Sequence, residues 1–155
     1  QPIAAPQSTI YQPGRVSDPW QPLFPTHDYP MPAAEACLTT WQLTGEERFA
    51  TAVRRWGGVL SRSLPARNGV GGYAEHYGRA IHFLHRAGQV LDEPTWTDLA
   101  CQVADESVRV LDAGKALRTH GWEARCEAVD GVGWLLLALL SLTQAEPPNM
   151  MGMIW

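Results

Sequence analysis

From residue 33 onward, apolar side chains recur every three or four positions, which is the spacing of residues on one face of an α-helix. The stripes are bounded by residue types that begin or end helices, among them Gly45, Pro94 and Gly114. They predict five helices, over residues 33–44, 47–64, 73–88, 94–113 and about 125–143. We therefore expect an all-α fold.

The two ends of the chain lack this pattern. Residues 1–32 hold eight of the twelve prolines, which remove backbone donors and disfavour helical dihedral angles. We expect an irregular Pro-rich arm over residues 1–32, a helical domain over 33–146 and a tail over 147–155. The arm contains several aromatic residues, which indicate that it packs against the rest of the protein.

The helical pattern repeats along the chain. An offset of 47 residues places Phe49 on Trp96, and an offset of 99 places Leu43-Thr44 on Leu142-Thr143. A period near 50 residues that contains two helices is typical of stacked helical hairpins, because one hairpin cannot bury its apolar stripe alone. The sequence predicts two and a half such hairpins.

Three segments carry a resemblance to a known group of proteins: Leu-Thr-Gly-Glu-Glu-Arg-Phe (43–49), Gly-Gly-Tyr-Ala-Glu-His-Tyr-Gly-Arg-Ala-Ile (71–81) and Asp-Gly-Val-Gly (130–133). With the hairpin pattern over residues 33–143, they resemble the (α/α) toroid proteins, the six-hairpin glycosidase-like superfamily. The resemblance implies inner helices that line a cavity, with a substrate cleft at one rim. A closed ring needs more than five helices. We therefore expect an incomplete toroid, either part of a longer chain or one whose open edge another subunit covers.

Carboxylates lie near the predicted start of the first helix in each hairpin. The repeat offsets carry Asp28 onto Glu75 and Glu127, and Asp130 is a nearby alternative for the third position. Glycoside hydrolysis uses such a pair, one carboxylate as acid and one as base or nucleophile. Acids at helix starts also stabilise the helix dipole without any catalytic role, and this second interpretation is open for all of them.

Glu75 has the richest surroundings in the sequence. Tyr73 precedes it, and His76 follows it, a residue type that suits proton transfer near neutral pH. Arg79 lies one turn further on, where it either binds substrate or pairs with Glu75 at i+4. His82 and His85 have no third ligand at a suitable spacing, so we expect no metal site and no cofactor.

Two other polar clusters precede predicted helices. His120, Trp122 and Arg125 suit a sugar or carboxylate subsite, with an indole stacked on a sugar ring and an arginine on an acid. An exposed loop anchored by Trp122 is the alternative interpretation. Trp20 and His27 accompany Asp28 in the arm. The remaining tryptophans lie on apolar stripes and are predicted to be core residues: Trp41, Trp56, Trp96 and Trp134.

Composition excludes several classes of partner. The net charge of −4 argues against nucleic-acid binding, which requires a basic face. The longest apolar run, residues 131–140, is about half of the roughly 20 residues that span a bilayer, so we expect no membrane segment. The three cysteines are widely separated, and we expect them to be buried apolar residues and not disulfides. The chain starts at Gln1, which suggests a processed or partial chain.

We therefore expect part of a carbohydrate-active toroid enzyme, a glycoside hydrolase or a uronyl lyase or hydrolase, acting on a saccharide or uronate. The predicted catalytic residues are Glu75, Asp28, Asp130 and His76. The predicted substrate-binding residues are Tyr73, Arg79, His27, Trp20, His120, Trp122 and Arg125. Two alternatives stay open. One is a non-enzymatic helical module that binds a partner protein or glycan through its open edge, and the other is a sugar epimerase that uses His76 and His120.

Overall fold

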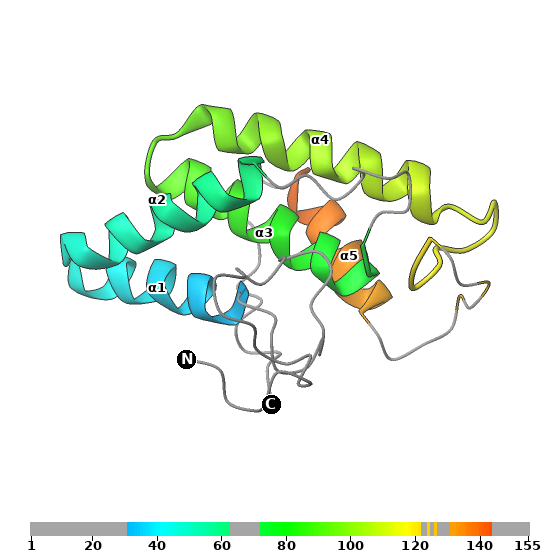
Figure 1. The fold of residues 1–155 in the computed structure, drawn as a ribbon, viewed down its shortest axis with the longest axis horizontal. Helices are drawn as coiled ribbons and strands as arrows, with labels where there is room; N and C mark the ends of the chain where they lie inside the picture. Colours follow the sequence, from blue (N-terminus) through cyan, green and yellow to red (C-terminus); the bar gives the residue numbers. More distant parts are fainter. Residues whose placement is uncertain (1–30, 63–71, 122–123, 125, 127–130, 144–155) are drawn as a thin grey trace, which may run out of the picture.

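A computed structural model describes residues 31–62, 72–121, 124, 126 and 131–143. It contains five α-helices in these ranges (Figure 1): α1 (Met31–Thr44), α2 (Glu47–Arg62), α3 (Ala74–Val90), α4 (Pro94–Leu111) and α5 (Val132–Ser141). The described part contains no β-strand beyond two isolated bridges. The expected all-α class is confirmed.

The first four helices form two hairpins, α1 with α2 and α3 with α4. Gly45 turns the chain between α1 and α2 with a φ of +68°, and its N–H donates to the carbonyl oxygen of Trp41 at 2.7 Å. Glycine adopts this left-handed conformation without strain, so it ends the helix as the sequence predicts. Asp92, with a φ of +56°, makes the corresponding turn between α3 and α4.

The first helices of the hairpins run side by side in one direction. Arg79 of α3 bonds to Glu35 of α1, and Arg86, two turns later, bonds to Gln42. On the other side of α3, Gly131 at the start of α5 lies against Glu75. Leu135, later in α5, lies against Gly78, which follows Glu75 in α3. The contacts of α3 with α1 and with α5 thus both advance in the same direction along the chains, so the three helices are parallel. Their N-terminal ends therefore point in the same direction (Figure 1).

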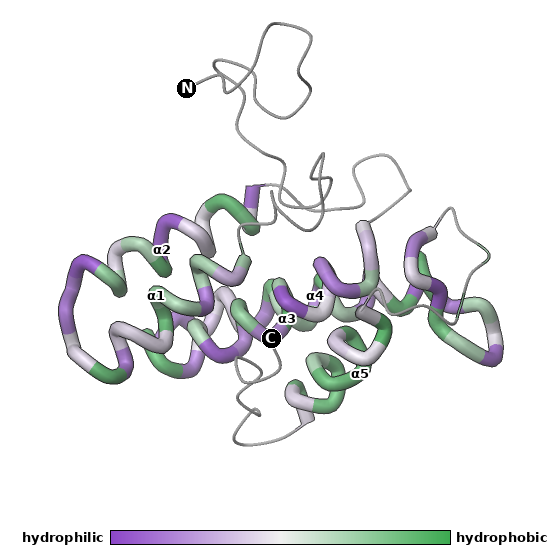
Figure 2. Tube along the Cα trace, turned by 90° about the horizontal axis from the view of Figure 1, so that it is seen from below, coloured by the Kyte–Doolittle hydropathy of each residue, from purple (hydrophilic) through white to green (hydrophobic). Residues whose placement is uncertain are grey.

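The second helices, α2 and α4, form the other layer. The ring of Trp96 in α4 lies so close to Gly57 in α2 that a Cβ at Gly57 would fall 2.5 Å from it. Helix α3 contacts all four other helices, and its residues are buried almost throughout. Helix α5 is apolar along most of its length (Figure 2) and packs on α3. Its outer residues Leu136 and Leu140 remain about half exposed.

The observed helix boundaries correct two expectations. Helix α1 begins at Met31, two residues earlier than predicted, because Pro32 fits the first turn, where no backbone donor is needed. Helix α5 begins only at Val132, since Gly131 is left-handed with a φ of +88° and interrupts any helix there. Ala124 and Cys126 are not helical, so the predicted start near residue 125 is wrong.

Exposure also corrects the expectation for the cysteines. All three thiols are free, but Cys101 is exposed on α4, and Cys37 and Cys126 are only partly buried. No helix in the described ranges combines the length and apolar character needed to cross a bilayer. The closure of these hairpins into a toroid stays a prediction, and the arm (residues 1–30) and the tail (147–155) lie outside the described residues.

Candidate functional site

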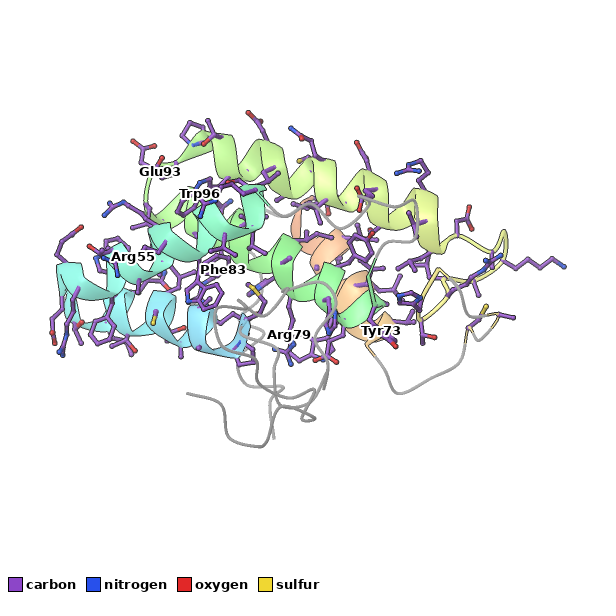
Figure 3. The ribbon with its side chains drawn as sticks, in the orientation of Figure 1. Arg55, Tyr73, Arg79, Phe83, Glu93 and Trp96 are labelled. Atoms are coloured by element: carbon purple, nitrogen blue, oxygen red, sulfur yellow. The ribbon has the colours of Figure 1, made fainter. Side chains whose placement is uncertain are left out.

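A polar cluster lies at the N-terminal end of α3, between α1 and α5. Tyr73 immediately precedes this helix and Arg79 is in its second turn (Figure 3). Because the three parallel helices begin at this end, side chains from all of them converge there. Further along α3, apolar core residues such as Ile81, Phe83 and Leu84 alternate with the buried His82 and His85.

Arg79 is the centre of this cluster. Its Nε donates to Oε1 of Glu75 at 2.8 Å, and its Nη1 donates to Oε2 of Glu35 at 3.2 Å. Its guanidinium lies 4.1 Å from the ring centroid of Trp134 in α5, within the range of a cation–π interaction. One side chain thus connects α1, α3 and α5.

Glu35 is the most deeply buried acid of the cluster. Its side chain is 4% exposed, whereas that of Glu75 is 36% exposed. Its Oε1 has no hydrogen-bond partner among the described residues. Burial raises the pKa of Glu35 to about 7, and the attraction of Arg79 offsets only part of this effect. Glu35 therefore binds a proton near neutral pH, while Arg79 holds it against α3.

An aromatic group flanks Glu75 on the loop side. The ring of Tyr73 lies 5.4 Å from that of His76 in an edge-on arrangement and 4.5 Å from that of His120. The loop is attached to the start of α3 because Ala74 N–H donates to the carbonyl oxygen of Thr119 at 2.8 Å. His76 and His120 are both buried. This bond brings together two segments that are about 45 residues apart.

Two glycines allow α5 to approach this end of α3. A Cβ at Gly131 would lie 2.2 Å from Cβ of Glu75, and a Cβ at Gly78 would lie 2.6 Å from the backbone N of Leu135. Real Cβ contacts are never this short, so only glycine fits at either position. The contact puts Gly131 beside Glu75, while Glu127, which the repeat offset makes the equivalent of Glu75, lies outside the described residues.

The structure brings together five of the predicted site residues: Tyr73, Glu75, His76, Arg79 and His120. The pairing of Arg79 with Glu75 at i+4 is the simpler of the two interpretations of that spacing, and it is the observed one. The remaining predicted residues lie outside the described part of the chain: Asp28, Asp130, His27, Trp20, Trp122 and Arg125.

Sequence reasoning missed two members of the cluster. Glu35 interrupts an apolar helix stripe, and a lone acid on such a stripe is a usable signal for a buried ion pair. The sequence predicts a core position for Trp134. It is partly buried, and its ring faces the guanidinium of Arg79. Only the packing of α5 on α3 reveals that contact.

The described side chains offer no cluster of three histidine, cysteine, aspartate or glutamate residues that could hold a metal ion. His82 and His85 lie deeper along α3 and are buried, and burial lowers the pKa of His85. A hollow of about 450 Å³ lies apart from the cluster, between the loop after α4 and the start of α5. Its apolar walls include Leu117, Val132 and Leu136.

No protein-family model matches the sequence, and no curated protein or solved structure matches the chain. The chemistry of the cluster is therefore inferred from its geometry.

Proposed function

We propose that this chain is part of a carbohydrate-active enzyme of the α/α toroid type, with its acid–base chemistry at the common N-terminal end of α1, α3 and α5. The observation that carries the proposal is that Arg79 joins an accessible carboxylate, Glu75, to a buried carboxyl, Glu35, that binds a proton near neutral pH. A buried carboxyl that shares a guanidinium with an accessible carboxylate controls how tightly that carboxylate is held.

Glu75 is the catalytic residue in this proposal. It is the accessible acid of the cluster, and its half-buried neighbour Tyr73 offers an aromatic face to a sugar. Aromatic rings next to carboxylates suit pyranose binding, since the apolar face of the sugar stacks while its hydroxyl groups find acceptors. His76 and His120 are as buried as Glu35, so we assign them to holding the ring of Tyr73 in place beside Glu75.

Glu35 acts as a positioning residue, because it is too buried to touch a substrate. When Glu35 is protonated, Glu75 alone balances the charge of Arg79. When Glu35 is ionised, two carboxylates share one guanidinium, and Glu75 interacts less strongly with it. The protonation of Glu35 therefore sets how tightly Arg79 holds Glu75, and the activity should depend on pH near neutrality.

Arg79 itself is committed to these internal partners. Two of its nitrogens are bonded to carboxylates and its face is covered by Trp134. We therefore assign it to positioning and not to the recognition of a substrate carboxylate. A uronate substrate would need another cation, and Arg118 is a half-buried arginine on the loop that carries His120.

The test is an assay of the purified chain on neutral and uronate-containing oligosaccharides, with new reducing ends, unsaturated products and epimerised products measured separately. Glu75→Gln should abolish turnover, while Glu35→Gln should retain part of it and lose the pH dependence near neutrality. Glu47→Gln is the matched control, because Glu47 is an exposed acid on α2 that pairs with Arg54. Turnover that is unchanged in Glu75→Gln would remove Glu75 from the mechanism.

A second candidate function is a binding module without catalytic activity. The half-exposed Leu136 and Leu140 on the outer side of α5 favour it, because α3 covers only one side of this helix. The adjoining apolar hollow shares Leu136 with this surface. Such a surface suits a partner or the continuation of a helical array. Saturable glycan binding without any product, unaffected by Glu75→Gln, would support this candidate over the enzyme.

A further inference from the structure

Helix α2 carries a row of arginines on the side opposite to its buried face. Arg48, Arg55 and Arg62 are exposed and are spaced by seven residues. Seven residues make almost two full turns, so the three side chains lie on nearly the same side of the helix, about 10 Å apart. The buried residues of α2 fall on the other side: Ala50, Val53, Gly57 and Leu60. We call these three arginines the basic stripe.

Helix α4 carries an acidic counterpart. Asp98 and Asp105 in the helix and Asp112, the residue directly after its last turn, are exposed and are also spaced by seven residues. They lie opposite to the buried side of α4, which includes Leu99 and Val103. We call these three aspartates the acidic stripe. Each of its members follows the corresponding arginine by 50 residues, so the two stripes have the same length and spacing.

Two members of each stripe have no partner within the described part of the chain. Arg55 and Arg62 make no ion pair or hydrogen bond with the described residues, and the same holds for Asp98 and Asp105. The ion pair between this part of α2 and the α3–α4 turn uses Arg54 instead, at 3.8 Å from Glu93. The charges of the two stripes are therefore available to an external partner.

We propose that the basic stripe of one copy binds the acidic stripe of a second copy. The two stripes have the same length, the same spacing and opposite charge, so one chain presents both halves of the contact. Arginine suits this contact because its planar guanidinium can donate two parallel hydrogen bonds to one carboxylate. Val108, 41% exposed and three residues from Asp105, adds apolar area beside the acidic stripe.

This association should be weak and sensitive to salt, because exposed ion pairs are stabilising only by small amounts and are screened. Raising the ionic strength from about 0.02 M to about 0.5 M shortens the screening length from roughly 20 Å to roughly 4 Å. We expect sedimentation or light scattering to show association of the full chain at low salt and a fall of at least about tenfold in its association constant at high salt.

Charge reversal provides the specific test. Arg55→Asp/Arg62→Asp and Asp98→Arg/Asp105→Arg should each be monomeric at low salt, because each then presents two stripes of like charge. An equimolar mixture of the two should associate again, since every stripe regains an opposite partner. Circular dichroism should show unchanged helix content, as all four positions are exposed.

A control variant tests whether association depends on the positions of the charges or only on the net charge of the protein. Arg54→Asp/Lys115→Asp changes the net charge as much as Arg55→Asp/Arg62→Asp does, but it leaves both stripes intact. It should retain the association at low salt. Cys101, exposed three residues after Asp98, should react with a thiol reagent more slowly at low salt than at high salt. A monomeric wild-type chain at low salt overturns the proposal, as does an equal loss of association in the control. A mixture that stays monomeric also overturns it, even if the single variants dissociate.

Discussion

Arg79 donates through Nη1 to Oε2 of Glu35 at 3.2 Å, although the two residues are 44 positions apart in the sequence. Together with the bonds from Arg86 to Thr39 and Gln42 two turns later, this bond fixes the register of α1 against α3. The contact between the hairpins is thus polar where it is closest to the candidate site. Its strength should depend on the charge of Glu35.

Replacement of Glu35 by glutamine should change the pH dependence of stability. The pKa of Glu35 rises from its ordinary value of 4.5 in the unfolded chain to about 7 in the folded protein, chiefly because the side chain is buried. The folded state therefore binds the proton of Glu35 more tightly than the unfolded chain does. The resulting contribution to the free energy of unfolding is complete below pH 4.5 and is lost as the pH rises through about 7. The wild type should lose up to roughly 3 kcal/mol across this window.

Chemical denaturation at several pH values between 4.5 and about 8 measures this loss. Glu35→Gln should show a flatter profile, since the amide does not titrate and still accepts a bond from Arg79. Glu47→Gln, on the exposed side of α2, should follow the wild-type profile. A wild-type profile that rises with pH over this window would contradict the assignment of the proton to Glu35.

Replacement of Arg79 should lower the free energy of unfolding more than replacement of Glu35 does. Arg79→Met removes the bond to Glu35, and a lost hydrogen bond to a charged group costs about 1.5–3 kcal/mol. In the double variant Glu35→Gln/Arg79→Met no buried charge remains, so its loss should be smaller than the sum of the two single losses. A double-mutant cycle of unfolding free energies measures the difference. Strict additivity would mean that the two side chains do not interact.

The helices could be predicted because their signals are local. Apolar residues at helical spacing place α2, α3 and α4 within a few residues, and Gly45 marks the end of α1 by its own chemistry. The start of α5 could not be placed, because the left-handed conformation of Gly131 depends on the close contact with Glu75. A glycine in a sequence does not reveal whether a turn or a neighbouring helix requires it.

The candidate site was predictable only on α3. Tyr73, Glu75, His76 and Arg79 are neighbours in sequence, so one helix start groups them. Glu35 and Trp134 join them through the packing of α1 and α5 on α3, which no local pattern specifies. The partner of Arg79 across 44 residues is the clearest case of information that only the packed structure contains.

Gly131→Ala should lower the stability of the protein through backbone strain, although alanine has a higher helix propensity than glycine. The new Cβ would lie 2.2 Å from Cβ of Glu75, and its residue would have to keep a φ of +88°. The backbone conformation alone costs roughly 1–2 kcal/mol for a residue other than glycine, and the steric conflict adds to it. We expect a lower melting temperature and a displaced Glu75.

Gly133→Ala is the matched control two residues later. A Cβ at Gly133 meets no atom within 4 Å, and the residue is in the first turn of α5. Alanine favours the helix over glycine by up to about 1 kcal/mol, so this variant should be as stable as the wild type or more stable. Equal destabilisation by both replacements would show that α5 tolerates no change in this turn, and the proposed contact with Glu75 would lose its support.

Tyr77→Phe should weaken the contact between α3 and α4. The hydroxyl of Tyr77 donates to Oε1 of Glu106 at 2.7 Å, and the ring is fully buried. Burial and the bond to Glu106 together raise the pKa of the Tyr77 hydroxyl above its ordinary value of 10. Loss of a buried bond to a charged acceptor costs about 1–3 kcal/mol, and we expect a value in this range for Tyr77→Phe.

The stability difference between the wild type and Tyr77→Phe should change at high pH. Because its pKa is raised on folding, its contribution to stability is present below pH 10 and is lost as the pH rises above this value. Tyr77→Phe should therefore be less stable than the wild type at pH 7, and the gap should narrow in alkaline solution. Glu106→Gln keeps an acceptor for the hydroxyl and should lose less stability at pH 7. A constant gap between wild type and Tyr77→Phe from pH 7 to pH 11 would show that Tyr77 titrates equally in both states.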